Sequence, residues 1–417
     1  MEQNWAGNLT YRATGIEHPE SVDELRRLIS SGGPVRILGS RHCFNDLADT
    51  MGVLLALDRL PRVLEVNERR DAVRVSGALR YGDLAPALET EGLALSNLAS
   101  LPHISVAGAV ATGTHGSGDA IGSLASSVRG LTILTTSGEI RTLNRGDDGF
   151  DGAVISLGAL GAVLEVTLDV EPTYAVAQQV YEHPSWDDIL ADLDAVTSAG
   201  SSVSIFSTWQ HTDIADQIWV KQRQPDVRTS ERTEQFARLG AEEAAGKRHP
   251  ILGADPVACT EQGGVPGAWF ERLPHFKLEF TPSAGAEIQS EYLVPRADAV
   301  AAIQAIRLLA GSIAPLLLVN EIRTVKADDL WLSSSYGTDA VGLHFTWKPD
   351  EAAIRAFLPI LEAALPPTAR PHWGKVFTLD GAEVRSRYPQ WDDFAALRAE
   401  FDPERRLVND YLERLGL

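Results

Sequence analysis

The nine residues from Arg36 to Phe44 constrain this chain more than any other stretch. An apolar run, Val35 to Leu38, ends in a glycine and a small polar cluster, and a histidine, His42, follows in the loop. The backbone N–H groups of such a loop can wrap a diphosphate while the imidazole is held at a fixed point. One short segment can therefore both bind a cofactor and bond to it, if other segments of the chain complete the site.

Length, charge and cysteine content narrow the class of protein. A chain of 417 residues is long enough for two or three domains, and its net charge of −20 argues against nucleic-acid or anionic-membrane partners, which need a basic surface. We find no basic leader with an apolar core at the start, and no apolar run long enough to span a membrane. Cys43 and Cys259 form neither a disulfide framework nor a metal-ligand spacing. We therefore expect a cytoplasmic protein without a metal, with a monomer as the default state.

The first 172 residues alternate between helix and strand patterns. Ser21 and Glu24 have the spacing of a capping box, with Glu24 reaching back to Ser21, and open a helix over 22–29. The pattern predicts further elements after it: strands at 35–38, 53–57 and 72–76, a helix at 81–89, a hairpin of 132–136 with 139–143, and a half-buried strand at 164–170. Because this last strand ends at a proline, Pro172, we place the first domain boundary there.

The remaining chain, from residue 173 on, has a different pattern of predicted elements. Extended stretches at 202–208 and 218–221, a polar stretch at 225–253, and alanine-rich helices near 297–309 and 351–365 predict an α+β layer, a mixed or antiparallel sheet covered by helices. A short helix at 409–415 closes the chain. We divide the chain into 1–172, 173–370 and 371–417.

A second segment, 105–118, is nearly free of large side chains. Eleven of its fourteen residues are Gly, Ala, Ser or Thr, so backbone can approach a ligand closely, although a tightly packed turn remains an alternative. The segment lacks the Gly-Lys-Ser/Thr ending of a P-loop and the dinucleotide fingerprint that follows a strand. A third piece, Leu157 to Val163, is either a turn into a strand or a further wall of the same site.

Taken together, these segments resemble the FAD domain of the vanillyl-alcohol oxidase family. The resemblance rests on the Gly-Ser-x-His loop, on Ser-Val-Ala-Gly…Thr-Gly-Thr-His-Gly at 105–116, and on Gly-Ala-Leu-Gly at 158–161. Pro371 to Lys375 is similar to the His-Trp-x-Lys signature of the family's sugar and aldonolactone oxidoreductases. Further family-like motifs stand in order along the chain, at 4–8, 98–103, 289–293, 321–325 and 344–347.

The resemblance implies a two-lobed FAD-binding domain built from both chain ends, with the middle third forming an α+β substrate domain. It implies FAD linked covalently through His42, whereas His115 either touches the flavin or braces its loop. The residues expected at the cofactor are Gly39, Ser40, Arg41, His42, Cys43, Phe44, Ser100, Ser105, Gly108, Ala109, Thr112, His115, Gly116, Gly158, Gly161 and Val163. Those expected at the substrate are Ser100, Gln289, Glu321, Arg323, His344, Thr346 and Lys375.

Two positions depart from the family pattern. Asp119 stands where the resemblance places an apolar residue facing the substrate. This difference puts in doubt the preference for polyol substrates that the resemblance implies. Residues 402–409 depart from the Asp-Pro-x-Gly-x-Phe-x-Asn ending, although Asn409 is retained.

The polar pairs at 321/323 and 344/346 have strand spacing. Side chains two residues apart point to one face, so two such strands present four polar groups to one cavity, unless they form a solvated sheet face. Arg323 and Lys375 are the cationic candidates for stabilising alkoxide character. Glu321 either holds Arg323 or binds a hydroxyl, and His344 either assists proton removal or is a structural hydrogen-bonder.

The resemblance and the residues of the predicted site leave three functions to be tested. The first is oxidation of the terminal CH2OH of an alditol such as xylitol or sorbitol to the aldehyde, with O2 reduced to H2O2. The second is an aldonolactone oxidase or dehydrogenase, and the third is a non-catalytic FAD- or sugar-binding protein. Binding alone does not require Glu321, Arg323 and Lys375 together, so the sequence favours an enzyme.

Overall fold

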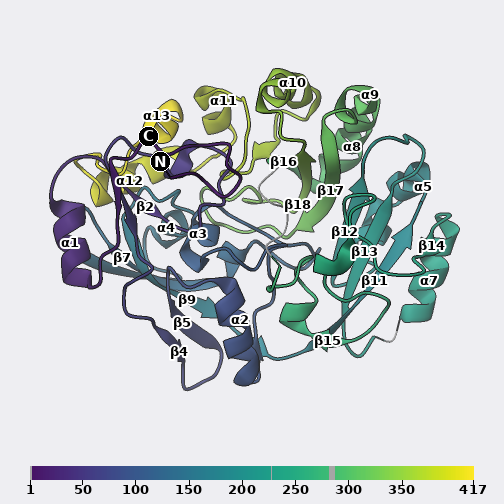
Figure 1. Cartoon of the computed structure of the whole chain (residues 1–417), viewed down its shortest axis with the longest axis horizontal. Helices are drawn as coiled ribbons and strands as arrows, with labels where there is room; N and C mark the ends of the chain where they lie inside the picture. Colours follow the sequence, from purple (N-terminus) through teal and green to yellow (C-terminus); the bar gives the residue numbers. More distant parts are fainter. Residues whose placement is uncertain (1, 227, 281–286) are drawn as a thin grey trace.

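The chain folds into two β-sheet systems that lie side by side (Figure 1). The computed structural model describes residues 2–226, 228–280 and 287–417. The two chain termini lie next to each other on the same half of the molecule. Within the described residues, no helix is long and apolar enough to cross a membrane.

The first half contains a small parallel sheet and a five-stranded antiparallel sheet. The parallel sheet has the order β1-β3-β2, with β1 (Gly15–Glu17), β3 (Val53–Ala56) and β2 (Val35–Leu38). The antiparallel sheet has the order β4-β5-β9-β7-β8, with β4 (Leu64–Val66), β5 (Ala72–Ser76), β9 (Ala162–Asp169), β7 (Val128–Leu134) and β8 (Ile140–Asn144). The helices of this half are α1 (Val22–Ser30), α2 (Tyr81–Thr90), α3 (Val106–Ala111) and α4 (Phe150–Val154). A two-stranded pair, β6 (Leu93–Ala94) with β10 (Glu171–Pro172), adjoins them.

Most elements expected from the sequence in this half are present. The predicted hairpin is β7–β8, and the helix that starts at Ser21 is α1. Only one of the two hydrogen bonds of the predicted capping box is present: the Ser21 hydroxyl accepts from the Glu24 N–H. The Glu24 carboxylate accepts from the N–H of Glu20 and not from that of Ser21. The backbone at Glu20 therefore takes the place expected for Ser21.

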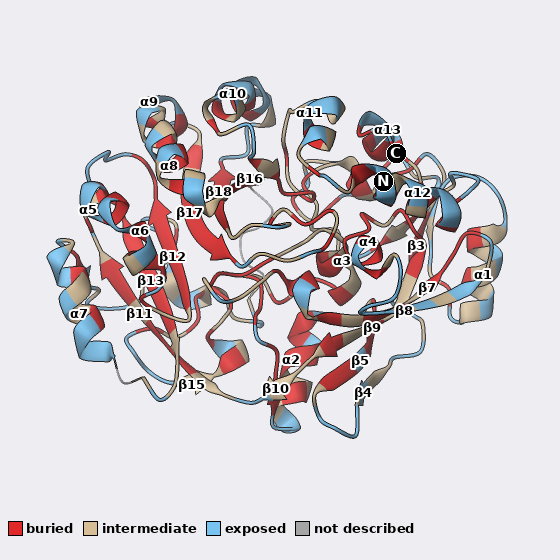
Figure 2. Ribbon diagram, turned by 180° about the vertical axis from the view of Figure 1, so that it is seen from behind, coloured by how far each residue is buried: buried red, intermediate tan, exposed pale blue. Residues whose placement is uncertain are grey.

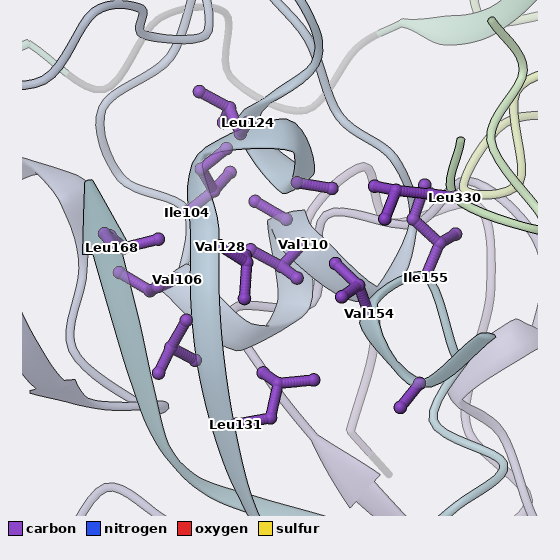
Figure 3. Close-up of a cluster of buried hydrophobic side chains, with 14 of the residues drawn as sticks. Ile104, Val106, Val110, Leu124, Val128, Leu131, Val154, Ile155, Leu168 and Leu330 are labelled. Carbon is purple, nitrogen blue, oxygen red and sulfur yellow. The ribbon is translucent and has the colours of Figure 1, made fainter. Parts of the chain in front are cut away.

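Helix α3 explains the small residues of the 105–118 segment. Val106 and Val110, one helical turn apart, pack against Val128, Leu131 and Leu168 of β7 and β9 (Figure 3). Since i and i+4 share a helix face, the small residues between them are left on the other side. Burial of the two valines thus anchors one face of α3. The opposite face, which has only small side chains and which we call the slim face, is left for a ligand.

The second half is built on a nine-stranded sheet. Its order is β14-β11-β13-β12-β17-β18-β16-β19, with β15 (Gly267–Ala268) paired to β11, and the pairings are antiparallel. The strands are β14 (Glu242–Glu243), β11 (Ala175–Glu182), β13 (Gln217–Arg223), β12 (Ser202–Ser207), β17 (Leu317–Val325), β18 (Ala340–Trp347), β16 (Ile288–Pro295) and β19 (Arg370–Pro371). Figure 2 shows its central strands buried along their length.

Helices cover one face of this sheet. They are α5 (Trp186–Ala191), α6 (Leu193–Thr197), α7 (Thr229–Arg238), α8 (Ala299–Leu308), α9 (Ala310–Ile313) and α10 (Glu351–Ala364). Helix α7 was not predicted, because it lies within the stretch 225–253 that was described only as polar. Their apolar side chains share a core with Ile205, Ile218, Ile322, Leu343 and Phe345 of the strands. The expected α+β layer is therefore present, and the other sheet face is free for a site.

The chain end returns to the first half. Helices α11 (Gly381–Ser386), α12 (Trp391–Phe401) and α13 (Asp410–Arg414) contribute to the same hydrophobic core as β5, β7 and β9. Of these three helices, only α13 was predicted from the sequence. The division at 172 and 370 stays a prediction.

Candidate active site

A cavity of about 470 Å³ is lined by both halves of the chain. Its lining contains most of the expected cofactor residues, namely Gly39, Ser40, Arg41, His42, Cys43, Phe44, Ser100, Gly108, Ala109, Thr112, His115 and Gly158. It also contains all the other expected substrate residues, which we call the polar wall, namely Gln289, Glu321, Arg323, His344, Thr346 and Lys375. The sequence motifs therefore meet at one place.

His42 lies in this cavity with an unused ring nitrogen. Its ring stacks on Trp5, with centroids 5.1 Å apart, and its Nδ1 is buried without a hydrogen-bond partner among the described residues. Burial lowers the pKa of His42 to about 4, so the ring is neutral at physiological pH. A neutral, fixed imidazole with a free nitrogen has the chemistry that a covalent bond to a cofactor requires.

The N-terminal motif holds the His42 loop in place. Asn4 Nδ2 donates to the carbonyl of Cys43 at 2.9 Å, and Asn8 Nδ2 donates to that of Phe44 at 3.0 Å. Arg41 adopts φ +64° and forms an ion pair with Glu2 at the surface. Asn4 and Trp5 belong to one of the family-like motifs, but no sequence pattern predicted that they contact the His42 loop.

A turn far away in the sequence is fastened to the same loop. Asn45 Nδ2 donates to the carbonyls of Trp373 and Lys375, both at 2.8 Å, and the Phe44 N–H donates to Gly374 at 2.7 Å. These bonds bring the Lys375 side chain to the cavity.

Buried Arg36 connects the third predicted segment to the loop. Its guanidinium donates to the carbonyls of Leu47, Leu157, Gly158 and Leu407, at 2.6–3.0 Å. Burial lowers its pKa to about 10. The segments around 36–47, 157–158 and 407 are thus tied together by one side chain.

The slim face of α3 lies close to the His42 loop. A Cβ on Gly39 would stand 2.9 Å from the Ser105 hydroxyl, and a Cβ on Gly108 would stand 2.7 Å from it. The Ser105 N–H donates to the Ser40 hydroxyl at 3.1 Å, while Ser105 Oγ is buried without a partner among the described residues. This approach leaves backbone and an orphaned hydroxyl beside the cavity.

Four expected cofactor residues do not line the cavity among the described residues: Ser105, Gly116, Gly161 and Val163. A Cβ on Gly116 would collide with Asn97 Oδ1 at 2.2 Å, and one on Gly161 with the Leu134 carbonyl at 2.4 Å. Val163 is part of β9 and pairs with Ile133. Both glycines therefore have packing reasons of their own.

Strand register assembles most of the polar wall. Glu321 of β17 and Glu291 of β16 both lie directly across from His344 of β18, so the three form one row on the sheet. Thr346 pairs with Gln289 in the adjoining row. The expected alternation holds, since the residues between the polar ones pack into the helix-covered core.

Glu291 is the centre of a buried charge network that the sequence analysis missed. Its carboxylate accepts from Arg323 Nη2 at 2.7 Å and Lys375 Nζ at 2.6 Å, and His115 Nε2 lies 3.1 Å away. Although burial opposes it, the neighbouring Lys375 and Arg323 hold the pKa of Glu291 well below its usual range. The alternation of Gln289 and Glu291 was a usable signal for this residue.

His344 is bonded on both ring nitrogens. Lys375 Nζ lies at hydrogen-bond distance from Nδ1, and Nε2 lies 3.0 Å from the Thr346 hydroxyl. Burial, with Lys375 as the next cause, lowers the pKa of His344 to about 4. Burial likewise lowers the pKa of Lys375.

Asp119 does not face the cavity. Its carboxylate accepts from Arg296 Nη1 at 2.7 Å and from the Thr197 hydroxyl at 3.1 Å, and it is absent from the cavity lining of the described residues. The expectation that this position faces the substrate was wrong, because Arg296, far away in the sequence, draws the side chain away.

The C-terminal turn that departs from the family pattern is held by hydrogen bonds. Arg405, at the position of the family glycine, adopts φ +56°, and the Asp402 carboxylate accepts from the N–H groups of Arg406 and Leu407. Asn409 donates to the carbonyls of Asp46, Leu47 and Asp49. The turn thus fastens the chain end to the segment after the His42 loop.

Comparisons with known proteins agree with this geometry. Residues 13–144 match the FAD binding domain family, and residues 286–415 match the D-arabinono-1,4-lactone oxidase family. Alditol oxidase from a Streptomyces species is 45% identical, covering 99% of this chain and 98% of its own. L-gulono-1,4-lactone dehydrogenase from Mycobacterium tuberculosis is 30% identical, with the same coverage. The crystal structure of cholesterol oxidase from B. sterolicum shares the fold, with a TM-score of 0.75 at 16% identity over 99% of this chain and 96% of that one.

The residues that line the cavity fit FAD. The orphaned nitrogen of His42 and the close approach of α3 stand on the wall formed by the FAD-binding region of the sequence. The full-length relative at 45% identity shows the family directly. The chain belongs to the vanillyl-alcohol oxidase family of FAD-dependent oxidoreductases, in the branch that holds the alditol and aldonolactone oxidases.

Proposed function

We propose that this protein oxidises the terminal CH2OH of an alditol such as xylitol or sorbitol to the aldehyde. The observation that carries the proposal is the polar wall of Gln289, Glu321, Arg323, His344, Thr346 and Lys375 in the same cavity that His42 lines. A polyol offers hydroxyls along its length, and this wall offers donors and acceptors in two adjoining rows. The identity to alditol oxidase supports the same substrate class.

Arg323 and Lys375 stabilise negative charge on the reacting oxygen. When bound, FAD accepts the hydride from the carbinol carbon. Both cations are buried and share Glu291, which holds them within hydrogen-bond distance of one carboxylate. Fixed cations in a site shielded from water need no reorganisation as charge develops.

The hydroxyl proton leaves through Lys375 and His344. The Lys375 ammonium donates to His344 Nδ1, so it passes a proton to the ring and takes the substrate proton in its place. The net transfer is from the substrate oxygen to His344, which is neutral at physiological pH because of its lowered pKa. Nε2 keeps its own proton and bonds to Thr346.

His42 forms the covalent link to the flavin in this proposal. Its unused Nδ1, the low pKa and the stacking on Trp5 support it. Denaturing the protein and separating it from free flavin tests the link, since a covalent flavin stays with the chain. We expect His42→Ala to release its flavin on denaturation, and the nearby variant His103→Ala to retain it. Release from the unaltered protein would disprove the link.

Anaerobic mixing with xylitol tests the activity. We expect the flavin absorbance to bleach, and oxygen to restore it with formation of H2O2. The matching lactone oxidase family and the lactone dehydrogenase relative favour arabinono- and gulonolactones as the second candidate substrates. Turnover of lactones alone would replace the alditol proposal, and a protein that stays yellow with both would be a binding protein.

The proposal extends to a cytoplasmic monomer that uses O2 as its acceptor. The acidic composition supports a freely diffusing protein. Light scattering of the purified protein checks the monomer, cell fractionation checks the compartment, and an artificial acceptor compared with O2 checks the acceptor.

A further inference from the structure

A buried lysine lies beside the polar wall, on the same face of the sheet. Lys221 of β13 is 2% exposed, and its Nζ contacts the Leu273 carbonyl and His275 Nδ1, the latter at 3.0 Å. His275 Nε2 lies 2.8 Å from Glu321 Oε1. The three side chains form a chain from β13 to the cavity, which His275 and Glu321 both line.

The donors of this chain fix its direction. The carboxylate of Glu321 is ionised and only accepts, so a neutral His275 ring carries its proton on Nε2 and donates it to Glu321 Oε1. Nδ1 then has no proton and accepts from Lys221 Nζ. Burial lowers the pKa of Lys221 to about 7, and Nζ donates both as an ammonium and as an amine, so Lys221 supports this tautomer on both sides of neutral pH.

Glu321 is left with one oxygen for the cavity. Arg323 Nε lies 3.6 Å from the same Oε1, and no hydrogen bond among the described residues occupies Oε2. The neighbouring Arg323 and His275 overcome the effect of burial and hold the pKa of Glu321 below its usual range. An ionised carboxylate accepts but does not donate, so its partner in the cavity must be a donor, such as a hydroxyl.

We propose that Lys221 and His275 are positioning residues that keep Glu321 an ionised acceptor aimed at a substrate hydroxyl, and thereby set the affinity for the polyol. The inference rests on the proposed function. Neither residue belongs to the catalytic pair of Arg323 and Lys375, so their loss is expected to change substrate binding more than the chemical step.

The surroundings keep His275 neutral. The charged and titratable groups that face it are Lys221, Glu321 and Arg323, and Cys259 lies near Lys221. The rings of Phe206, Trp219 and Phe276 surround it at centroid distances of 5.3–6.4 Å. Burial, with Lys221 as the next cause, lowers the pKa of His275 to about 4.

Paired substitutions at His275 test the proposal. Gln reaches about as far as the imidazole Nε2 and donates without titrating, whereas Phe keeps bulk and donates nothing. A hydrogen bond to a charged group contributes about 1.5–3 kcal/mol, so we expect His275→Phe to raise KM for xylitol about 10- to 150-fold. We expect kcat to change less than about threefold, and His275→Gln to stay within about threefold of the unaltered KM. Equal KM values for the two variants would overturn the proposal.

A second measurement uses the unaltered holoenzyme and is independent of turnover. Nitrogen NMR of labelled histidine distinguishes the ring tautomers, and we expect His275 to carry its proton on Nε2 between pH 5 and 8. In Lys221→Met we expect its pKa to rise, because a neighbouring cation is gone. A proton on Nδ1 in the unaltered protein would overturn the inference. Failure of xylitol to bleach the unaltered protein would instead refute the proposed function and leave this tautomer test in force.

Discussion

Replacing Glu291 by Gln tests whether one buried carboxylate sets the charge of Lys375. Glu291 is 1% exposed and lies 2.6 Å from Lys375 Nζ and 2.7 Å from Arg323 Nη2. The amide keeps the size of the side chain and one acceptor oxygen, but it removes the negative charge. Two buried cations then face each other without their shared partner.

The expected consequence is a lower pKa of Lys375. A carboxylate this close raises the pKa of a cation by about 1–3, or about 1.4–4 kcal/mol. Burial already lowers the pKa of Lys375 in the unaltered protein. Without Glu291, the Lys375 ammonium is therefore expected to lose its proton at a lower pH than in the unaltered protein. When a buried ion pair loses one partner and the other stays charged, the free energy of unfolding falls by about 3–5 kcal/mol. Release of the Lys375 proton makes the loss in Glu291→Gln smaller than this.

The assay is the rate of flavin bleaching by xylitol, measured without oxygen as a function of pH. We expect the alkaline fall of the rate to move about 1–3 pH units lower in Glu291→Gln, with recovery on acidification. Glu362→Gln is the control, because Glu362 accepts from neutral groups, Tyr292 and Thr378. A rate that is equally reduced at every pH would refute the reasoning.

Three further predictions concern stability and specificity. Lowering the pH from about 6.5 to 4 should reduce the free energy of unfolding, because His275 and His344 stay neutral in the fold until about pH 4 but take up protons when unfolded. Each contributes about 3 kcal/mol, which urea titrations across this range would detect. Asp119→Ala should leave KM for xylitol within about twofold and cost about 1 kcal/mol, since its ion pair with Arg296 is partly exposed. Gly161→Ala should destabilise the protein by about 1–3 kcal/mol whether or not flavin is bound, because φ is +144° and a Cβ would meet Leu134.

Each of these has an outcome that contradicts it. Stability independent of pH between 4 and 6.5 would mean that these histidines are protonated in the fold. A large rise in KM for Asp119→Ala would return that position to the substrate site. Destabilisation of Gly161→Ala only when flavin is bound would make Gly161 a cofactor contact.

Local sequence determined the elements and their buried faces. Period-two alternation around Ile322 and Phe345 predicted which side chains face the cavity, because strand geometry fixes that without tertiary information. The small residues near Gly108 predicted a close backbone approach. The helices α11 and α12 were missed because their packing partners lie in distant strands.

Tertiary structure decided which charges meet. Register between β16, β17 and β18 puts Glu291, His344 and Glu321 in one row, and no local pattern reports register between strands so far apart in sequence. Arg296 turned Asp119 away from the cavity for the same reason. The sequence by itself determined which residue types the site has and which faces present them; only the fold decided that Glu291 joins the two cations, because that contact depends on three strands and a distant turn held by Asn45.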